Sequence, residues 1–238
     1  MAITPFLAMT AAEIRGNSVL PGQIAWMACH FSPYGLGLSN LPRALPPGSL
    51  LMVDDVTPIR GHDPQRILDQ LGACAERLSC RGILLDFQRP DVEETAALTE
   101  VLTGGLPCPV AVSHFYAGAG SFPVFLPPVP PSEPLECHFA PWQGREIWLE
   151  LALDAVEVTV TEEGSVFHPL PSAASTEPEF YDEALLCRYH CDAQEDAVRF
   201  TLRRSPEDLD RFLSESEKYG VAQAVGLYQE LHRHTIGA

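Results

Sequence analysis

The stretch from Arg81 to Pro90 constrains the fold of this chain most strongly. Its short apolar run lies between two helical patterns, which is typical of a parallel β-strand covered by helices on both faces. In sheets and barrels of this kind, functional side chains gather at the carboxyl ends of the strands. Asp86 and Gln88 stand at that end, two residues apart, and we expect them to point to the same side.

Further strands and helices alternate along the chain. Asp63 and Pro64 are typical of a helix start, and the apolar spacing that follows predicts a helix to about Ser79. A second helix is expected from Asp91, with glycines at its end. Buried strands are predicted for residues 23–31, 49–56, 109–115, 135–140, 146–153 and 221–228.

Two segments depart from this alternation. Residues 122–134 contain six prolines, which excludes helix and interior strand, so we expect an extended loop. Residues 156–161 with 165–167, and 185–189 with 197–202, alternate around polar turns and predict antiparallel hairpins. At 238 residues the chain fits one domain, residues 1–238, in which about 146–202 includes the hairpin insertion.

The central stretch resembles the catalytic strand of family 18 glycoside hydrolases, the chitinase-like barrels, whose pattern is Asp-Gly-x-Asp-x-Asp-x-Glu. Gly82 and Asp86 match this pattern, and an aromatic follows at Phe87. Arg81 and Leu84 stand where the pattern has its first two aspartates, and Gln88 stands where it has its acid/base glutamate. The stretch is thus similar to a degenerate form of the motif.

The C-terminal third is similar to the end of the same barrel, especially in its spore-cortex-lytic, N-acetylglucosaminidase-like branch. A hairpin, a helix opened at Ser205 and a last strand follow in the family's order. The resemblance implies an α/β fold, a (β/α)8 TIM-like barrel, reduced or irregular, with an antiparallel β-hairpin region inserted before the last βα unit. One βα unit is missing unless residues 3–7 supply it.

The resemblance also implies a chemistry that this sequence lacks. In the family, the substrate's own N-acetyl group attacks the anomeric carbon, an Asp orients that group, and a Glu protonates the leaving oxygen. Gln88 has no such proton to give, and loss of a general acid costs about 10²–10⁴ in rate. The family's sixth-strand Tyr-Asp pair is also absent from Cys137 to Ala140, where we place that strand.

These departures predict a catalytically disabled protein that binds an N-acetylglucosamine-containing glycan or a peptidoglycan fragment in the barrel mouth. Asp86 and Gln88 would hold polar groups of the sugar. Three aromatic residues are candidates for stacking on a pyranose ring: Tyr228, Tyr116 and Trp142. Tyr228 stands where the resembling branch has a tryptophan that forms the floor of the sugar site. Ordinary packing is the other interpretation for all three.

Two other functions stay open at this stage. Asp54 or Asp55, together with Asp86 and His30, forms a candidate acid/base or metal-assisted site for an active hydrolase of different chemistry. Because Asp54 and Asp55 are adjacent, at most one of them enters the mouth. Alternatively, the proline-rich loop and the acidic surface serve a structural or interaction scaffold whose cleft is vestigial.

The composition of the chain limits the kinds of partner that we expect it to bind. A formal net charge of −17 disfavours binding to nucleic acid and to anionic membrane surfaces. No secretory pattern and no membrane-length apolar run is found, so we expect a cytoplasmic location, with a spore-associated role implied by the resemblance. Seven cysteines suit reduced thiols. We expect no cofactor and no metal, and interpret Cys187 and Cys191, which flank His190, as thiols on a strand.

Overall fold

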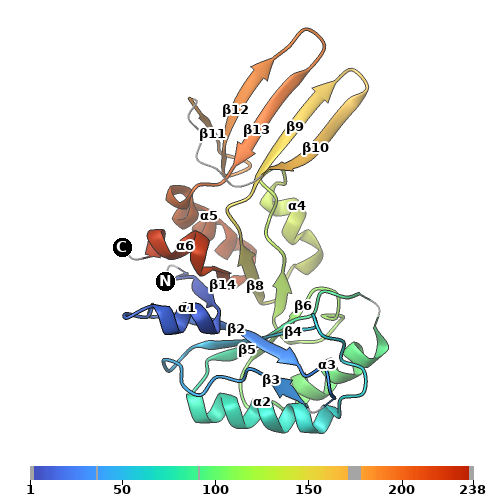
Figure 1. The fold of residues 1–238 in the computed structure, drawn as a ribbon. Coiled ribbons are helices and arrows are strands. Elements are labelled where there is room, and N and C mark those ends of the chain that lie inside the picture. Colours follow the sequence, from blue (N-terminus) through green and yellow to red (C-terminus); the bar gives the residue numbers. More distant parts are fainter. Residues whose placement is uncertain (1–2, 36, 91, 171–177, 236–238) are drawn as a thin grey trace.

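A computed structural model describes residues 3–35, 37–90, 92–170 and 178–235. Within these residues, eight parallel strands close into a barrel, and β1 pairs with both β2 and β14 (Figure 1). The predicted TIM-like barrel is therefore confirmed. In order around the barrel its strands are β1 (Phe6–Met9), β2 (Ile24–Phe31), β4 (Leu50–Asp54), β5 (Gly82–Asp86), β6 (Val110–Ser113), β7 (Val124–Leu126), β8 (Ile147–Leu151) and β14 (Val221–Leu227).

The N-terminal lead-in supplies the strand that the sequence left in question. All four residues of β1 are buried, and Leu7 pairs with Ile24 on β2 and with Gly226 on β14. The unit that the sequence left in question is therefore present, and the lead-in supplies it, which was one of the two alternatives. The lead-in was hard to recognise because the strand is only four residues long, below the length at which periodicity is informative.

Two predictions in the middle of the chain are wrong. Residues 122–134 were expected to contain no interior strand, but β7 fits between Pro123 and Pro127, so the prolines flank the strand and no ladder hydrogen bond is lost within it. Residues 135–140 were expected to be a strand, but they form α4 (Leu135–Phe139) and the start of η1 (Ala140–Trp142). The sixth barrel strand is consequently β7 and not 137–140.

Helices cover the outside of the barrel. The predicted helix after β4 is confirmed as α2 (Pro64–Leu78), where the Asp63 side chain accepts a hydrogen bond from the Gln65 N–H. Asp91, the expected start of the next helix, lies outside the described residues. The other helical elements are α1 (Ala11–Gly16), α3 (Glu93–Gly105), η2 (Pro206–Asp208), α5 (Leu209–Ser216), η3 (Glu217–Tyr219) and α6 (Tyr228–Thr235).

The helical layer is irregular. After β2 the described residues contain only the short strand β3 (Leu38–Ser39), which pairs antiparallel with the end of β2, and after β6 they contain a loop. In the described part of the chain, no helix has the length and apolar character needed to cross a membrane.

The lower interior of the barrel is apolar and densely filled. Phe6, Leu84, Phe125 and Trp148 belong to one buried cluster of inward-facing residues. The Trp148 ring lies so close to Gly82 that a Cβ atom on that glycine would stand 2.6 Å from the ring. Glycine at this position of β5 therefore makes room for tryptophan on β8.

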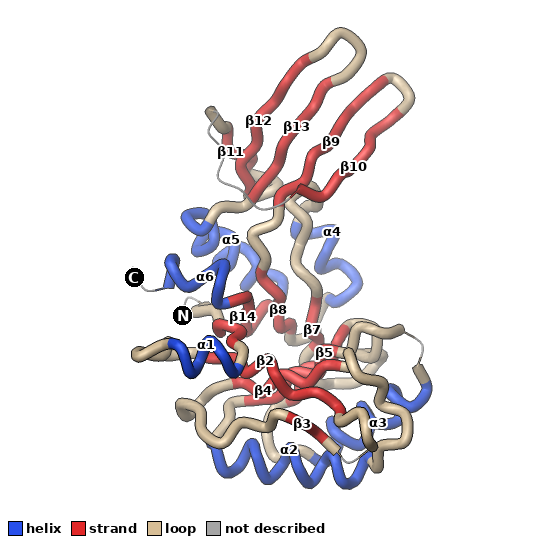
Figure 2. The backbone as a smooth tube through the Cα atoms, in the orientation of Figure 1, coloured by secondary structure: helices blue, strands red, loops and turns tan. Residues whose placement is uncertain are grey.

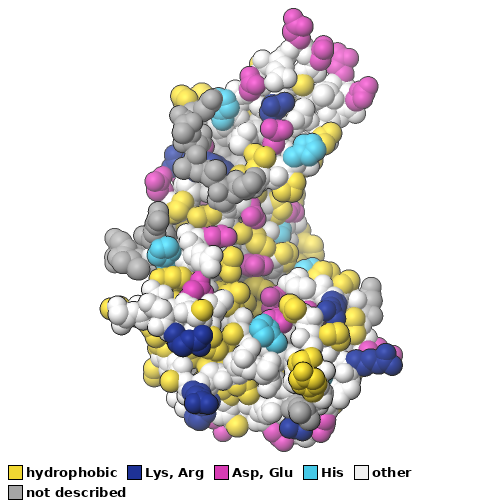
Figure 3. All heavy atoms as spheres, in the orientation of Figure 1, with side chains coloured by type: hydrophobic (Ala, Val, Ile, Leu, Met, Phe, Trp, Pro, Cys, Tyr) yellow, Lys and Arg dark blue, Asp and Glu magenta, His cyan; other side chains and the backbone are white. Residues whose placement is uncertain are grey.

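Between β8 and η2 the chain forms a second sheet that projects beyond the barrel (Figure 2). Its hairpins confirm the predicted insertion, and acidic side chains gather at their tips (Figure 3). In chain order its antiparallel strands are β9 (Ala155–Thr161), β10 (Gly164–Leu170), β11 (Phe180–Asp182), β12 (Cys187–Ala193) and β13 (Val198–Arg203).

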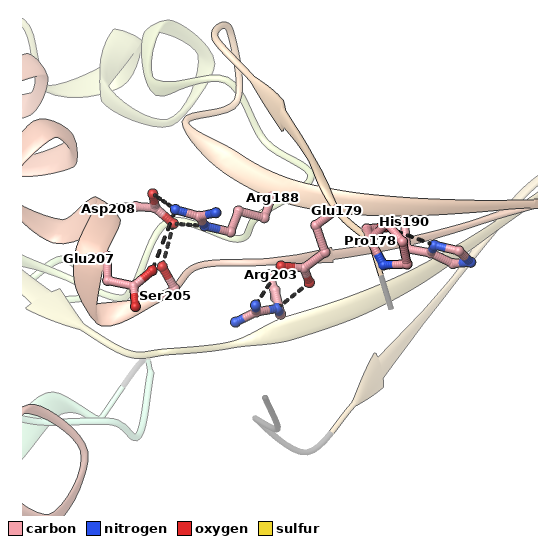
Figure 4. A network of polar contacts seen from close by, with 8 residues as sticks. All are labelled: Pro178, Glu179, Arg188, His190, Arg203, Ser205, Glu207 and Asp208. Carbon is pink, nitrogen blue, oxygen red and sulfur yellow. Dashed lines mark hydrogen bonds and ion pairs between the residues drawn. The ribbon is translucent and has the colours of Figure 1, made fainter. Parts of the chain in front are cut away.

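Ion pairs fix the base of the second sheet. Arg188 on β12 donates two hydrogen bonds to Asp208, at 2.9 and 3.0 Å, and Arg203 pairs with Glu179 (Figure 4). Buried Arg204 donates to the carbonyl oxygens of Val129 and Pro130 and lies 4.4 Å from the Phe212 ring centroid. These contacts attach the sheet to the loop before α4 and to α5.

Gly82→Ala is expected to destabilise the protein by about 1–3 kcal/mol, because the added methyl group overpacks the barrel interior against Trp148. Urea unfolding measures the change. Gly104→Ala, in α3 with open space around it, is the matched control and should stabilise by about 0.5–1 kcal/mol. Equal effects of the two substitutions would contradict this interior packing.

Candidate functional site

The inward-facing positions at the carboxyl ends of the strands form the candidate site, which we call the mouth. Leu50 and Leu84 belong to the interior cluster, so alternation along β4 and β5 also turns Asp54 and Asp86 inward. These two carboxylates are direct neighbours in the β4–β5 register. Neighbouring strands lie about 4.8 Å apart, which brings two negative charges close together.

His30 joins this group from β2. Its Nδ1 atom lies 2.6 Å from Oδ2 of Asp54, while Oδ1 of Asp54 accepts a hydrogen bond from the Val56 N–H at 3.1 Å. The structure thus brings together three of the residues that the sequence proposed, His30, Asp54 and Asp86. The imidazole and the Val56 amide stabilise the Asp54 carboxylate within the mouth.

Asp86 and Gln88 interact directly. The Gln88 side-chain amide donates a hydrogen bond to Oδ1 of Asp86. Burial raises the pKa of Asp86, the charges of Asp54 and Asp55 raise it further, and the hydrogen bond from Gln88 opposes both effects. Gln88 itself is exposed, so its remaining hydrogen-bonding groups face the solvent at the rim of the mouth.

Asp55 is a structural residue, which corrects its proposed role in the site. It is 4% exposed, and its two carboxylate oxygens accept the backbone N–H groups of Gln88 and Arg89 at 2.9 and 3.1 Å. Asp55 thereby holds the chain after β5 against the end of β4. Only Asp54 of the adjacent pair faces the mouth, as their opposite orientations require.

Glu150 on β8 is a residue of the mouth that the sequence analysis missed. Trp148 belongs to the interior cluster whereas Leu149 and Leu151 pack outside the barrel, so Glu150 faces inward, one inward position beyond Trp148. Burial raises its pKa to about 7, with further contributions from the charges of Asp86, Asp154 and Glu230. A lone carboxylate within an apolar strand was the signal that could have revealed it.

Ser113, the last residue of β6, was also missed. It follows the inward-facing Ala111 by two positions, and its side chain therefore points into the barrel. The residue is 1% exposed, and its hydroxyl group has no hydrogen-bond partner among the described residues. Buried hydroxyl groups are normally paired, so an unpaired one is unusual. Because the oxygen is closed off from solvent, it lies beneath the mouth and does not line its surface.

Three aromatic candidates serve packing, which corrects their proposed stacking role. The Tyr116 hydroxyl group donates to the Arg89 carbonyl oxygen and accepts from the Val92 N–H at 3.2 Å, and so ties the loop after β5 to the end of β6. Trp142, in η1, packs against the cluster outside the barrel.

Tyr228 likewise lies outside the barrel. Its hydroxyl group donates to Oδ1 of Asn17, next to α1, at 2.9 Å, and its ring stacks on His232. After Val225, the next inward-facing residue of β14 is Leu227, which is 40% exposed. The sugar-floor position predicted for Tyr228 is therefore occupied by an aliphatic side chain.

The cysteines form no disulfide. All seven are free, with Cys29, Cys74 and Cys187 buried and Cys137 and Cys191 exposed. A search of the described residues finds no group of three or more His, Cys, Asp or Glu side chains arranged to hold a metal ion.

Comparison with known proteins identifies the fold. No protein-family model and no curated protein matches the sequence. Among solved structures, the chain is similar to the spore cortex-lytic enzyme SleL from Bacillus cereus, with 12% identity and a TM-score of 0.59 over 98% of this chain and 74% of that one. The architecture is accordingly that of the chitinase-like and SleL-like barrels, as the sequence motifs predicted.

Two further structures span nearly all of both chains. A mutant family 18 chitinase from Cycas revoluta in complex with (GlcNAc)4 has 13% identity and a TM-score of 0.57, covering 98% of this chain and 97% of that one. A chitinase-like agglutinin from Robinia pseudoacacia has 11% identity and a TM-score of 0.56, covering 96% and 97%. At such identities the likeness establishes the fold, and any activity must be argued from the site.

Glu150 is expected to make stability depend on pH. A Glu side chain in the unfolded chain titrates near 4.5, whereas Glu150 in the fold titrates near 7. The folded state therefore binds the Glu150 proton more tightly than the unfolded state does. The protonated carboxyl group contributes stability below pH 4.5, and about 3 kcal/mol of this contribution is lost as pH rises to about 7.

Glu150→Gln keeps the side chain neutral, and its stability relative to wild type should increase across that pH window. Urea unfolding at several pH values measures the difference. Glu163→Gln, on the exposed turn between β9 and β10, is the control and should show a constant difference. Parallel curves for wild type and Glu150→Gln would show that Glu150 is ionised at neutral pH.

Proposed function

We propose that this protein binds an N-acetylglucosamine-containing glycan in the barrel mouth and does not hydrolyse it. The observation that carries the proposal is the set of inward polar groups around the mouth: Asp86 with Gln88, and Asp54 with His30. They stand above an apolar interior, and a few convergent polar groups over apolar walls are typical of small-molecule sites.

The groups of the mouth suit an acetamido sugar. The Asp86 carboxylate is an acceptor for the N–H of an N-acetyl group, and the exposed amide of Gln88 both donates and accepts, as sugar hydroxyl groups do. Met27 and Met52 pack at the upper edge of the interior cluster and offer flexible apolar surface to a pyranose ring. A glycan partner is also consistent with the (GlcNAc)4 complex of the similar Cycas revoluta chitinase.

The absence of hydrolysis follows from the residues at the motif. Gln88 replaces the acid, and Leu84, where the resembling family has an aspartate, is buried in the apolar cluster. The true sixth strand, β7, runs from Val124 to Leu126 into two prolines and also lacks a Tyr-Asp pair. The family's proton donor and the groups around it are thus missing together.

A second candidate is hydrolysis by other carboxylates. It is favoured by Asp86 and Glu150, which both have raised pKa values, and the charge of Asp86 contributes to the raised pKa of Glu150. Two carboxyl groups that differ in protonation form an acid/base pair in several enzymes. Asp55 no longer belongs to this candidate, because its oxygens hold backbone amides.

Gln88→Ala is expected to weaken binding of N-acetylglucosamine oligomers by about five- to tenfold, the equivalent of one neutral hydrogen bond. Isothermal calorimetry measures the affinity. Gln143→Ala, which removes the same side chain from an exposed position after η1, is the control and should bind as wild type does.

A hydrolysis assay on the same oligomers separates the candidate functions. Wild type should release no sugar. Release by wild type that is abolished by Glu150→Gln would replace the binding proposal with the second candidate. Failure of wild type to bind either oligomers or peptidoglycan fragments would leave a scaffold whose function resides on its outer surface.

Ser113→Ala is expected to stabilise the free protein by about 1 kcal/mol and to leave glycan affinity unchanged, because it removes a buried hydroxyl group that has no partner and that solvent does not reach. Ser216→Ala is the matched control: its buried hydroxyl group donates to the Phe212 carbonyl oxygen at 2.8 Å, outside the barrel. That variant should lose stability and keep its affinity. Loss of stability in Ser113→Ala would mean that the hydroxyl group has an internal partner.

A further inference from the structure

Among the described residues at the carboxyl ends of the strands, Glu150 is an inward carboxyl group that neither the motif nor the proposed glycan contacts use. Trp148, two residues earlier on β8, fills the barrel down to Gly82, and Glu150 occupies the next inward position of that strand. Across the β8–β14 ladder it pairs with Val225, another interior residue. Its carboxyl group therefore lies between the apolar interior and the carboxyl ends of the strands.

The charges around Glu150 are negative. Asp86 faces it from β5, three strands away around the barrel, with Asp54 and its partner His30 behind Asp86. Asp154 follows the end of β8, and Glu230 lies on α6, where it accepts the Leu153 N–H at 3.1 Å. None of the charged groups that shift the pKa of Glu150 is a cation.

We propose that Glu150 is a further ligand-facing residue, and that a glycan closing the mouth takes up a proton on this carboxyl group. The inference rests on the proposed function. A neutral glycan over the mouth removes water from Glu150 and adds no positive charge to offset its ionisation. The bound state therefore favours the neutral carboxylic acid, which can also donate a hydrogen bond to a sugar oxygen or to Asp86.

The coupling between glycan binding and protonation of Glu150 determines how the affinity depends on pH. Glu150 titrates close to neutrality in the free protein, and the glycan stabilises its protonated form. Affinity should therefore be constant at acidic pH and fall above neutrality, by up to about tenfold per pH unit if only the neutral form binds. Proton uptake on binding should be largest where the free carboxyl group is ionised and the bound one is not.

Calorimetry with an N-acetylglucosamine tetramer between pH 5.5 and 9, in two buffers of different ionisation enthalpy, tests the proposal. Wild type should take up close to one proton per bound tetramer above neutrality and lose about 25-fold in affinity between pH 6.5 and 8.5, as a free-state pKa of about 7 requires. Glu150→Gln, which mimics the neutral acid, should bind with nearly constant affinity across this range and without that uptake. Glu163→Gln should behave as wild type does.

The outcomes separate the two proposals. Binding at pH 6 with the same pH dependence in wild type and Glu150→Gln would overturn the role of Glu150 and leave the glycan site intact. Proton uptake that persists in Glu150→Gln and disappears in Asp86→Asn would assign the proton to Asp86 and overturn the inference as well. No binding by any variant at any pH would overturn both proposals.

Discussion

The contact between Trp148 and Gly82 determines what the upper barrel can contain. An indole ring that reaches from β8 to β5 fills the lower interior with apolar atoms. Among the described residues, Asp54, Asp86 and Glu150 are the inward carboxyl groups at the carboxyl ends of the strands, while Glu146 accepts the Trp148 indole N–H from the opposite end of β8. The interior offers them little solvation, and burial is the first cause of the raised pKa values of Asp86 and Glu150.

The mouth compensates for its negative charge with hydrogen bonds. Asp54 is supported by His30 and the Val56 amide, and Asp86 by the Gln88 side chain. Glutamine at position 88 donates to its carboxylate neighbour, whereas an ionised glutamate there would repel it. Gln88 therefore stabilises the Asp86 carboxylate next to it.

Sequence patterns predicted the barrel, because Asp86 and Gly82 stand in a recognisable strand motif and the helix α2 has a regular apolar face. They failed where elements are very short. β1 has four residues and β7 three, and segments of this length show no period. The five residues of α4 were mistaken for a strand for the same reason, although Pro134 just before them is compatible with a helix start.

Within the site, the sequence found the residues of β2, β4 and β5 and missed those of β6 and β8. Ser113 and Glu150 have no neighbouring motif, and they become significant only when alternation is counted from interior residues such as Ala111 and Trp148. Tyr228 was predicted to lie in the mouth but lies outside the barrel, because a shift of one residue along a strand moves a side chain to the other face.

The position of Glu150 changes what a carboxyl group can do in this barrel. An acid at position 88 would stand at the exposed rim, in contact with water before and after a ligand binds. Glu150 stands below the rim, where a ligand that closes the mouth also removes its water. Desolvation on binding is thus converted into proton uptake. The glycan binding that we propose would therefore respond to pH.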